Sequence, residues 1–325
     1  MFVLWSRLRN FLYDKKILSS VSTPIFAISI GNLTWGGTGK TSLVRELTEF
    51  LIASGFRVAI LSRGYRRTTK GPIVVSDGTE LKCSWQQSGE EAYLLAKWLP
   101  GAITAVSENR SAGFRLVEGL SPDVILLDDA FQHRKVKRDL DIVLVDASED
   151  ITSLKMIPFG KLREPPCSLK RADAIVLTHD NEASPHTIAW MRDNMDRPVF
   201  HCNYVVTDRS LVNGKKIGAI CAIGSPHHFF RLLRQEGAEL VITKTFRDHH
   251  VFTQQQITDF RAKAKKVGAE FIITTAKDLV RINPEWLDDF IKVLNVKLQI
   301  AEESIFFDFV LERLNQSVKR HSRLS

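Results

Sequence analysis

The chain has 325 residues, of which 44% are hydrophobic and 25% are charged. This composition excludes a disordered or low-complexity chain, and the length predicts two domains. The formal net charge of +8 favours anionic partners, such as nucleic acid, an anionic membrane surface or a phosphorylated substrate. The four cysteines form no CxxC pair, and no apolar run is long enough to cross a bilayer. Neither a zinc site, a disulfide framework nor a transmembrane helix is therefore expected.

Residues 1–20 form the first predicted element, a short amphipathic helix. Leu4, Trp5, Leu8 and Phe11 recur at helical spacing, and arginine and lysine residues accompany them. A helix of about 12 residues is roughly 18 Å long, which is too short to span a bilayer. The pattern fits a helix that lies in the membrane interface. Taken alone, it favours a helix that packs on the core of its own protein, because amphipathic helices usually face a core.

Residues 21–200 predict a doubly wound, mostly parallel α/β sheet. Near-continuous runs of Val, Ile and Leu indicate strands that are covered on both faces, and helical patterns separate several of them. Acidic and glycine-rich motifs follow these strands, at the edge where such sheets bind ligands. The predicted strands lie in TPIFAISIGN, FRVAILSRGY, AITAVS, DVILLDD, DIVLVDA and DAIVLTH, and the predicted helices in TSLVRELTEFLIASG and EEAYLLAKWL.

Residues 201–325 predict a second, smaller α/β domain. KIGAICAIGSPHHFFRLLRQEG has the pattern of a strand, a loop and a helix, and AELVITKTF and EFIITTAKD have the pattern of further strands. Thr253 and Gln256 have the spacing of a capping box at the start of a helix.

The segment GNLTWGGTGKTS, residues 31–42, has the features of a phosphate-binding loop between a strand and a helix. Its glycines let several backbone N–H groups point inward, and the following helix adds its positive N-terminal end. Lys40 is expected to reach the β- and γ-phosphates, and Thr41 to bind Mg²⁺. Thr34 stands where the general motif has glycine. The predicted nucleotide-binding residues are Thr34, Trp35, Gly36, Gly37, Thr38, Gly39, Lys40 and Thr41.

Two adjacent carboxylates, Asp128 and Asp129, end the buried run VILLDD. A phosphate-loop protein needs an acidic residue at the end of such a strand to bind Mg²⁺, directly or through water. Asp128 and Asp129 both qualify, and the predicted metal ligands are Thr41 and Asp128.

The motifs GNLTWGGTGKT, SRGY, DDAFQH, GKLREP, AIGSPHHFF and TTAKD occur in this order between about residues 24 and 280. This series resembles the tetraacyldisaccharide 4′-kinases, whose phosphate loop also carries threonine at the irregular position. The resemblance implies a P-loop enzyme that uses ATP and Mg²⁺ to phosphorylate the 4′-hydroxyl of a tetraacylated glucosamine disaccharide 1-phosphate in lipid A biosynthesis. It also implies a peripheral, monotopic enzyme on the cytoplasmic face of the bacterial inner membrane. It thus favours the membrane-interface interpretation of residues 1–20.

The same resemblance suggests the catalytic residues. The family has an acidic residue in a Gly-Asp-Glu stretch, paired with a histidine from the second domain. Here the stretch reads SGEEAYLLA, so Glu90 replaces the usual aspartate and Glu91 matches the glutamate. The histidine is expected in FRDHHVF, where His249 directly follows Asp248 as in the Asp-His pair of the family. His250 remains the alternative. The predicted catalytic residues are Glu90, His249, Lys40 and Asp128.

Four further polar residues match family positions in the cleft: Arg63, Arg110, His133 and Arg163. Together with Glu91 and Asp129, they are predicted to contact substrate or phosphate, because an arginine guanidinium binds phosphate through two parallel hydrogen bonds. The alternative for each is a structural ion pair. Lys277 and Asp278 in TTAKD are either an ion pair or a contact to the nucleotide.

Two other functions are compatible with parts of the sequence. A P-loop ATPase or GTPase switch that acts on a protein partner is the main alternative, but a guanine-binding motif separates its lysine and aspartate by one residue, whereas Lys277 and Asp278 are adjacent. A nucleic-acid binder is suggested by charge alone, without a stacking or recognition-helix motif. We therefore expect neither a nucleic-acid partner nor an obligate protein partner.

Overall fold

The structure is a computed structural model that describes residues 2–321; for residues 2–5, 7 and 318–321 it describes the backbone alone. The chain forms two compact units. The first contains the residues up to Asn203 and those from Leu298 onwards, and the second is Tyr204–Lys297.

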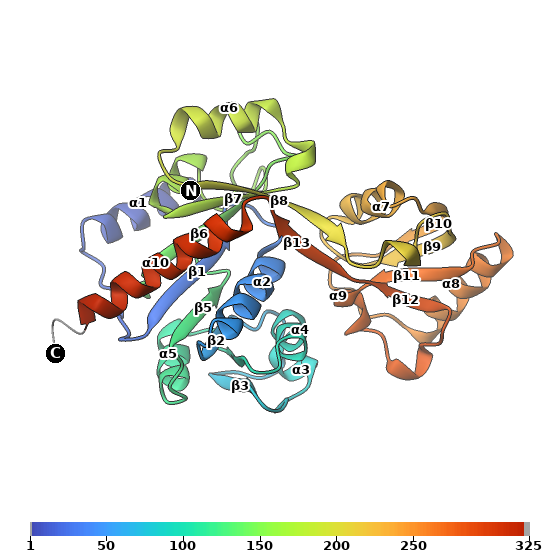
Figure 1. The fold of residues 1–325 in the computed structure, drawn as a ribbon, viewed down its shortest axis with the longest axis horizontal. Helices are drawn as coiled ribbons and strands as arrows, with labels where there is room; N and C mark the ends of the chain where they lie inside the picture. The colour runs from blue at the N-terminus through green and yellow to red at the C-terminus, as the bar shows by residue number, and fades with distance from the viewer. Residues whose placement is uncertain (1, 322–325) are drawn as a thin grey trace. The chain divides into compact units, whose positions relative to one another are not determined.

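A nine-stranded sheet is the centre of the first unit, with strand order β13-β8-β7-β6-β1-β5-β2-β4-β3 (Figure 1). All neighbouring strands from β8 to β4 in this order are parallel, and β3 runs antiparallel to β4 at one edge. The predicted doubly wound, mostly parallel sheet is thus confirmed. The strands are β1 (Phe26–Asn32), β2 (Val58–Ser62), β3 (Ile73–Asp77), β4 (Ile103–Val106), β5 (Val124–Asp128), β6 (Leu140–Asp146), β7 (Ala174–Thr178), β8 (Val199–Val206) and β13 (Val296–Ile300).

Helices cover both faces of this sheet, because its central strands are apolar on both sides. Phe114 of α5 packs with Ala27 and Ile125 on one face, whereas Ile28 and Ile30 of β1 point to the other face, which α2 covers. The helices of this unit are α1 (Phe2–Asp14), α2 (Lys40–Ala53), α3 (Trp85–Ser88), α4 (Glu90–Trp98), α5 (Arg110–Glu118), α6 (Pro185–Asn194) and α10 (Glu303–His321), with short 3-10 turns at Pro166–Arg171 and Asp180–Glu182.

The C-terminal segment does not belong to the second unit, although residues 201–325 are predicted above to form one domain. The second unit ends at Lys297, and the chain then returns to the first unit. β13 is bonded to β8 in the large sheet. Phe307 of α10 stacks on Phe50 of α2, with ring centroids 4.0 Å apart. The apolar face of α10 completes the first core, which explains why this helix belongs there.

The second unit contains a four-stranded parallel sheet with the order β10-β9-β11-β12. The predicted capping box is present, since the side chain of Thr253 accepts a hydrogen bond from the backbone N–H of Gln256 and the Gln256 side chain bonds back. Its elements are β9 (Lys216–Cys221), α7 (Pro226–Gln235), β10 (Glu239–Thr245), α8 (Gln254–Lys266), β11 (Phe271–Thr275), α9 (Ala276–Leu279) and β12 (Ile291–Leu294), with 3-10 turns at Arg209–Leu211 and Pro284–Trp286.

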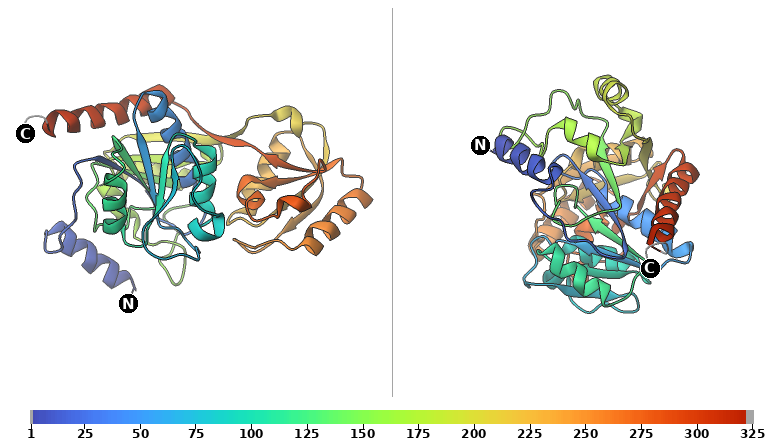
Figure 2. Two further views of the ribbon diagram at one scale, coloured as in Figure 1. Left: turned by 90° about the horizontal axis from the view of Figure 1, so that it is seen from below. Right: turned by 90° about the vertical axis from the view of Figure 1, so that its left-hand side faces the viewer.

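Helix α1 lies at the periphery of the first unit, joined to β1 by an extended segment (Figure 2). Polar side chains attach this helix to the rest of the unit. The fully buried carboxylate of Glu164 accepts hydrogen bonds from Arg9 at 2.9 Å, Asn10 at 3.1 Å and Arg171 at 2.7 Å. Leu8 and Phe11, in contrast, are 57% and 52% exposed. Among the described residues, no helix has both the length and the apolar character of a membrane span.

Candidate active site

The phosphate loop connects β1 to α2, as the sequence predicts. Gly39 precedes the first residue of α2 with φ = 92°, and Gly36 has φ = 119°. Side chains other than glycine rarely adopt these left-handed backbone angles, which explains the glycines at these two positions. The side-chain amide of Asn32 donates a hydrogen bond to the hydroxyl of Thr38 at 2.7 Å and ties the two ends of the loop together.

Thr34, the irregular residue of the loop, lies in a strand-like segment. It forms an antiparallel bridge with Leu162. On either side, the backbone N–H of Trp35 donates to the carbonyl of Lys161 at 2.8 Å, and that of Arg163 donates to the carbonyl of Leu33 at 2.7 Å. A β-branched residue suits such an extended backbone better than glycine does. The pairing gives a physical reason for threonine at this position.

Lys40 and Thr41 form the first turn of α2, where the positive end of the helix dipole lies. The Lys40 ammonium is 3.8 Å from a carboxylate oxygen of Asp129. The Thr41 hydroxyl donates a hydrogen bond to Glu91 at 3.4 Å. The loop therefore brings a cation and a hydroxyl to the carboxylates that follow β5 and begin α4.

Asp128 ends β5 and is almost completely buried. It accepts a hydrogen bond from the Ser62 hydroxyl at 3.1 Å. Burial, together with the neighbouring carboxylates of Glu91 and Asp129, raises its pKa to about 6. Carboxylates and a hydroxyl gathered in this way are the oxygen ligands that Mg²⁺ prefers, and a divalent cation would relieve their mutual repulsion. The residues present therefore fit a Mg²⁺ ion.

Asp129 has a left-handed backbone, with φ = 50°, which is costly for a residue other than glycine. Arg163 holds its carboxylate through two hydrogen bonds of 2.9 and 2.7 Å. Although burial acts against ionisation, the cations of Lys40, Arg163 and Arg110 hold the pKa of Asp129 well below its usual range. Asp129 is thus a fixed anion beside the phosphate loop, and Arg163 is its ion-pair partner.

Arg110 is buried and donates to two backbone carbonyls, to Leu61 at 2.6 Å and to Asp128 at 2.5 Å. This favours the structural interpretation of Arg110, because both bonds fix the ends of β2 and β5. Burial lowers the pKa of Arg110 to about 10.

The other two predicted cleft residues are His133 and Arg63. Burial and the nearby Arg110 lower the pKa of His133 to about 4, so His133 is neutral at pH 7. Arg63 is exposed directly after β2.

Glu90 and Glu91 are the first two residues of α4. Gly89 precedes them with φ = 88°, and a Cβ atom there would lie 2.8 Å from the carbonyl oxygen of Tyr65. Only glycine therefore allows the chain to turn into α4 against the SRGY segment. This turn places both carboxylates at the positive end of the helix dipole, a position that favours acidic side chains.

In the second unit, the two candidate histidines have different environments. His250 is bonded to the Gln256 side chain at 2.8 Å and stacks on Phe246 at 4.6 Å. His249 has a left-handed backbone, with φ = 63°, and its ring nitrogen is 3.7 Å from the carboxylate of Asp248. The contacts of His250 are those of a structural residue, which favours His249 as the functional histidine.

Asp278 takes part in a buried ion pair with Arg281. Its carboxylate accepts hydrogen bonds from Arg281 at 2.5 Å, from the Thr275 hydroxyl at 2.6 Å and from the backbone N–H of Ala222 at 3.0 Å. A carboxylate held in this way stabilises the end of β9, and these bonds argue against a role in guanine binding.

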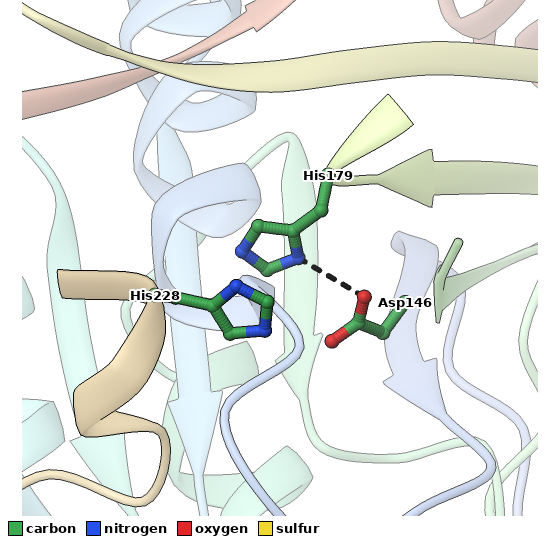
Figure 3. A group of neighbouring side chains, drawn as sticks. All are labelled: Asp146, His179 and His228. Atoms are coloured by element: carbon green, nitrogen blue, oxygen red, sulfur yellow. Dashed lines mark hydrogen bonds and ion pairs between the residues drawn. The ribbon is translucent and has the colours of Figure 1, made fainter. Parts of the chain in front are cut away.

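A further polar pair, absent from the predicted site residues, lies at the ends of β6 and β7. The Nδ1 atom of His179 is 3.2 Å from Asp146 (Figure 3). Asp146 also accepts hydrogen bonds from the Ser148 backbone and hydroxyl. Both residues lie at the C-terminal ends of the predicted strand segments DIVLVDA and DAIVLTH, so the rule that ligands bind at strand ends would have identified them.

A glycine-rich loop between a buried parallel strand and a helix, with paired carboxylates at the end of the neighbouring strand, defines a P-loop protein that binds a nucleoside triphosphate. Comparison with known proteins narrows this class. Residues 1–315 match the family of the tetraacyldisaccharide-1-P 4'-kinases, and the chain belongs to this family. The resemblance seen in the motifs is thereby confirmed.

Individual relatives of this chain carry the name of the same family. The tetraacyldisaccharide 4'-kinase of Chlorobium phaeovibrioides is 39% identical over 300 residues, covering 87% of this chain and 84% of the relative. The enzyme of the same name from Chlorobaculum parvum is 40% identical, with coverage of 86% and 81%. The crystal structure of LpxK from Aquifex aeolicus in complex with ATP is similar with a TM-score of 0.78 and 32% identity, covering 96% of each chain.

Proposed function

We propose that this chain is a kinase that uses ATP and Mg²⁺ to phosphorylate the 4′-hydroxyl of a tetraacylated glucosamine disaccharide 1-phosphate, a step of lipid A biosynthesis. Membership of the 4'-kinase family over residues 1–315 carries the proposal. The geometry of the phosphate loop supports it, because Lys40 and the N-terminus of α2 lie beside the buried Asp128.

The chemistry needs positioning and charge neutralisation more than a strong base, because charge gathers on the phosphate oxygens in the transition state. The backbone amides of residues 36–41 and the Lys40 ammonium bind the triphosphate. Thr41 and Asp128 would hold Mg²⁺, which neutralises phosphate charge when bound. Arg163 keeps Asp129 oriented and ionised, so that this carboxylate stays beside Lys40 without moving into the phosphate site.

We assign Glu90 the role of orienting the acceptor hydroxyl and of accepting its proton late in the transfer. Its place in the first turn of α4, directly before Glu91, puts the carboxylate next to the residue that the Thr41 hydroxyl contacts. His249, beside Asp248, is assigned the relay of that proton.

Replacing Glu90 or His249 with alanine should lower kcat about 10²-fold each, the usual contribution of a positioned acid or base. The assay follows the labelled γ-phosphate of ATP into tetraacyldisaccharide 1-phosphate in detergent micelles. His250→Ala is the matched control, because its contacts to Gln256 and Phe246 predict lower thermal stability with kcat retained.

Near-normal turnover by His249→Ala, with turnover lost in His250→Ala, would reverse the assignment of the histidine. If the wild-type enzyme released all the label as inorganic phosphate and none reached the lipid, the kinase proposal itself would be wrong, and a nucleotide-hydrolysing switch would take its place.

We also propose that the enzyme binds the cytoplasmic face of the inner membrane peripherally, through α1. The support is the division of this helix into a polar side, where Arg9 and Asn10 bind Glu164, and the exposed apolar side chains Leu8 and Phe11. Exposed apolar residues next to lysine and arginine are typical of helices that lie in the headgroup region of an anionic membrane.

The double variant Leu8→Gln/Phe11→Gln should reduce binding to vesicles of phosphatidylethanolamine and phosphatidylglycerol about tenfold or more, because both side chains would enter the lipid. Co-sedimentation measures this binding. Deleting the helix is less informative, since Glu164 would lose two of its partners. Val267→Gln, at an exposed apolar residue of the second unit, is the control. Unchanged sedimentation of the double variant would contradict a membrane role for α1.

A further inference from the structure

Two large aromatic side chains are exposed beside the phosphate loop. Trp35 is 68% exposed and Phe159 is 86% exposed. Single exposed apolar side chains are common on protein surfaces. These two, however, lie on segments that are bonded to each other, because Thr34 bridges Leu162 and the N–H of Trp35 donates to the carbonyl of Lys161 at 2.8 Å.

The backbone of both segments is fixed by the core beneath it. Leu33 and Leu162, one on each segment, are buried in the same hydrophobic cluster. The turn that carries Phe159 is closed by two hydrogen bonds, from the N–H of Ile157 to the carbonyl of Leu162 and from the N–H of Phe159 to that of Met156, both 3.0 Å long. These contacts fix the backbone on which Trp35 and Phe159 stand, and this backbone leaves both side chains exposed.

The position of these side chains restricts what they can bind. The acceptor hydroxyl must reach the γ-phosphate at the phosphate loop. A disaccharide with four acyl chains carries these chains only a few bonds from each hydroxyl, so an acyl chain must lie near the loop whenever the hydroxyl does. Cations border the same segments, since Lys155 is exposed and Lys161 is half-buried in an ion pair with Glu149. The surroundings thus suit a lipid that is apolar in its chains and anionic at its phosphate.

We infer that Trp35 and Phe159 form an aromatic rim that binds the acyl chains of the lipid acceptor during phosphoryl transfer. This rests on the proposed function. Large flat side chains bury much apolar area at a low cost in conformational entropy, which suits contact with flexible chains. The occupant is the substrate, because the rim adjoins the loop at which that substrate reacts.

Steady-state kinetics on the full-length enzyme test the inference. Phe159→Ala should raise KM for tetraacyldisaccharide 1-phosphate about tenfold and leave KM for ATP unchanged, because Phe159 lies outside the phosphate loop. Trp35→Ala should raise KM for the lipid by a similar factor. The apolar variants Trp35→Phe and Phe159→Leu should retain most of the affinity. Leu81→Ala, which removes another exposed apolar side chain of the same unit, should leave both constants unchanged.

Acceptors with progressively shorter acyl chains give a second readout, which a general loss of stability would not reproduce. The ratio of KM between Phe159→Ala and wild type should fall towards one as the chains shorten. The inference is overturned if this ratio is independent of chain length, or if the variants lose only their binding to phosphatidylglycerol vesicles, which would indicate the bilayer as the occupant. Wild-type transfer to the lipid, measured in the same series, separates failure of this inference from failure of the proposed function.

Discussion

Replacing Lys40 with alanine is expected to reduce phosphoryl transfer about 10²- to 10³-fold while the protein stays folded. Lys40 is the cation at the N-terminus of α2, 3.8 Å from Asp129. Its ammonium is expected to stabilise charge that develops on the transferred phosphoryl group, and removal of one such fixed donor has an effect of this size. Lys40 is not part of the hydrophobic core, so the fold does not depend on it.

The measurement is the rate of label transfer from ATP to the lipid under single-turnover conditions, together with the circular dichroism spectrum of each variant. Lys70→Ala removes an exposed lysine of the same unit and is the control. If Lys40→Ala transferred phosphate at more than a tenth of the wild-type rate, the assignment of the phosphate loop would fail.

The second large effect is expected from Asp128→Asn, which should abolish most Mg²⁺-dependent transfer and at the same time stabilise the metal-free enzyme. Asparagine keeps the shape and can still accept the hydrogen bond from Ser62. It removes a buried negative charge that lies next to Glu91 and Asp129. The midpoint of thermal unfolding in EDTA at pH 7.5 should rise by a few degrees, which corresponds to on the order of 1–2 kcal/mol.

The difference in stability between Asp128→Asn and the wild type should depend on pH, and the pKa of Asp128 gives the direction. The pKa of Asp128 is about 6 in the folded protein, above its ordinary value of 3.8. Ionisation of this carboxyl group therefore opposes folding, and the wild type loses stability as the pH rises from about 4 through 6. The advantage of Asp128→Asn should vanish below about pH 4 and be complete above about pH 7. A lower unfolding midpoint for Asp128→Asn at pH 7.5 in EDTA would contradict this account of the carboxylate cluster.

The large sheet and the phosphate loop were predictable from the sequence because their signals are local. Strands such as VILLD are apolar along their whole length, and GGTGKT specifies a loop and the start of a helix within a few residues. The Thr253–Gln256 capping box is local in the same sense. The structure agrees with the sequence-based predictions for these elements, which needed only hydrophobic periodicity or local turn and capping patterns.

Features that depend on contacts between distant segments were not predictable in this way. Nothing in the sequence of α10 shows that Phe307 stacks on Phe50, so the return of the chain to the first unit was missed. The pairing of Thr34 with Leu162 likewise joins segments more than 120 residues apart, as the numbering shows. The roles proposed for Arg110 and Arg163 also required the structure, because similar residues in similar motifs bind backbone carbonyls in one case and a carboxylate in the other.

The central claim is that the backbone amides of residues 36–41 and the ammonium of Lys40 bind the triphosphate, with Mg²⁺ on Thr41 and Asp128. A crystal structure of the full-length enzyme with Mg²⁺ and a non-hydrolysable ATP analogue tests it most directly. The account predicts the β- and γ-phosphates within hydrogen-bonding distance of these amides and the Lys40 ammonium, and the metal ion on the Thr41 hydroxyl. Density for the phosphates elsewhere on the protein, with this loop empty, would contradict it.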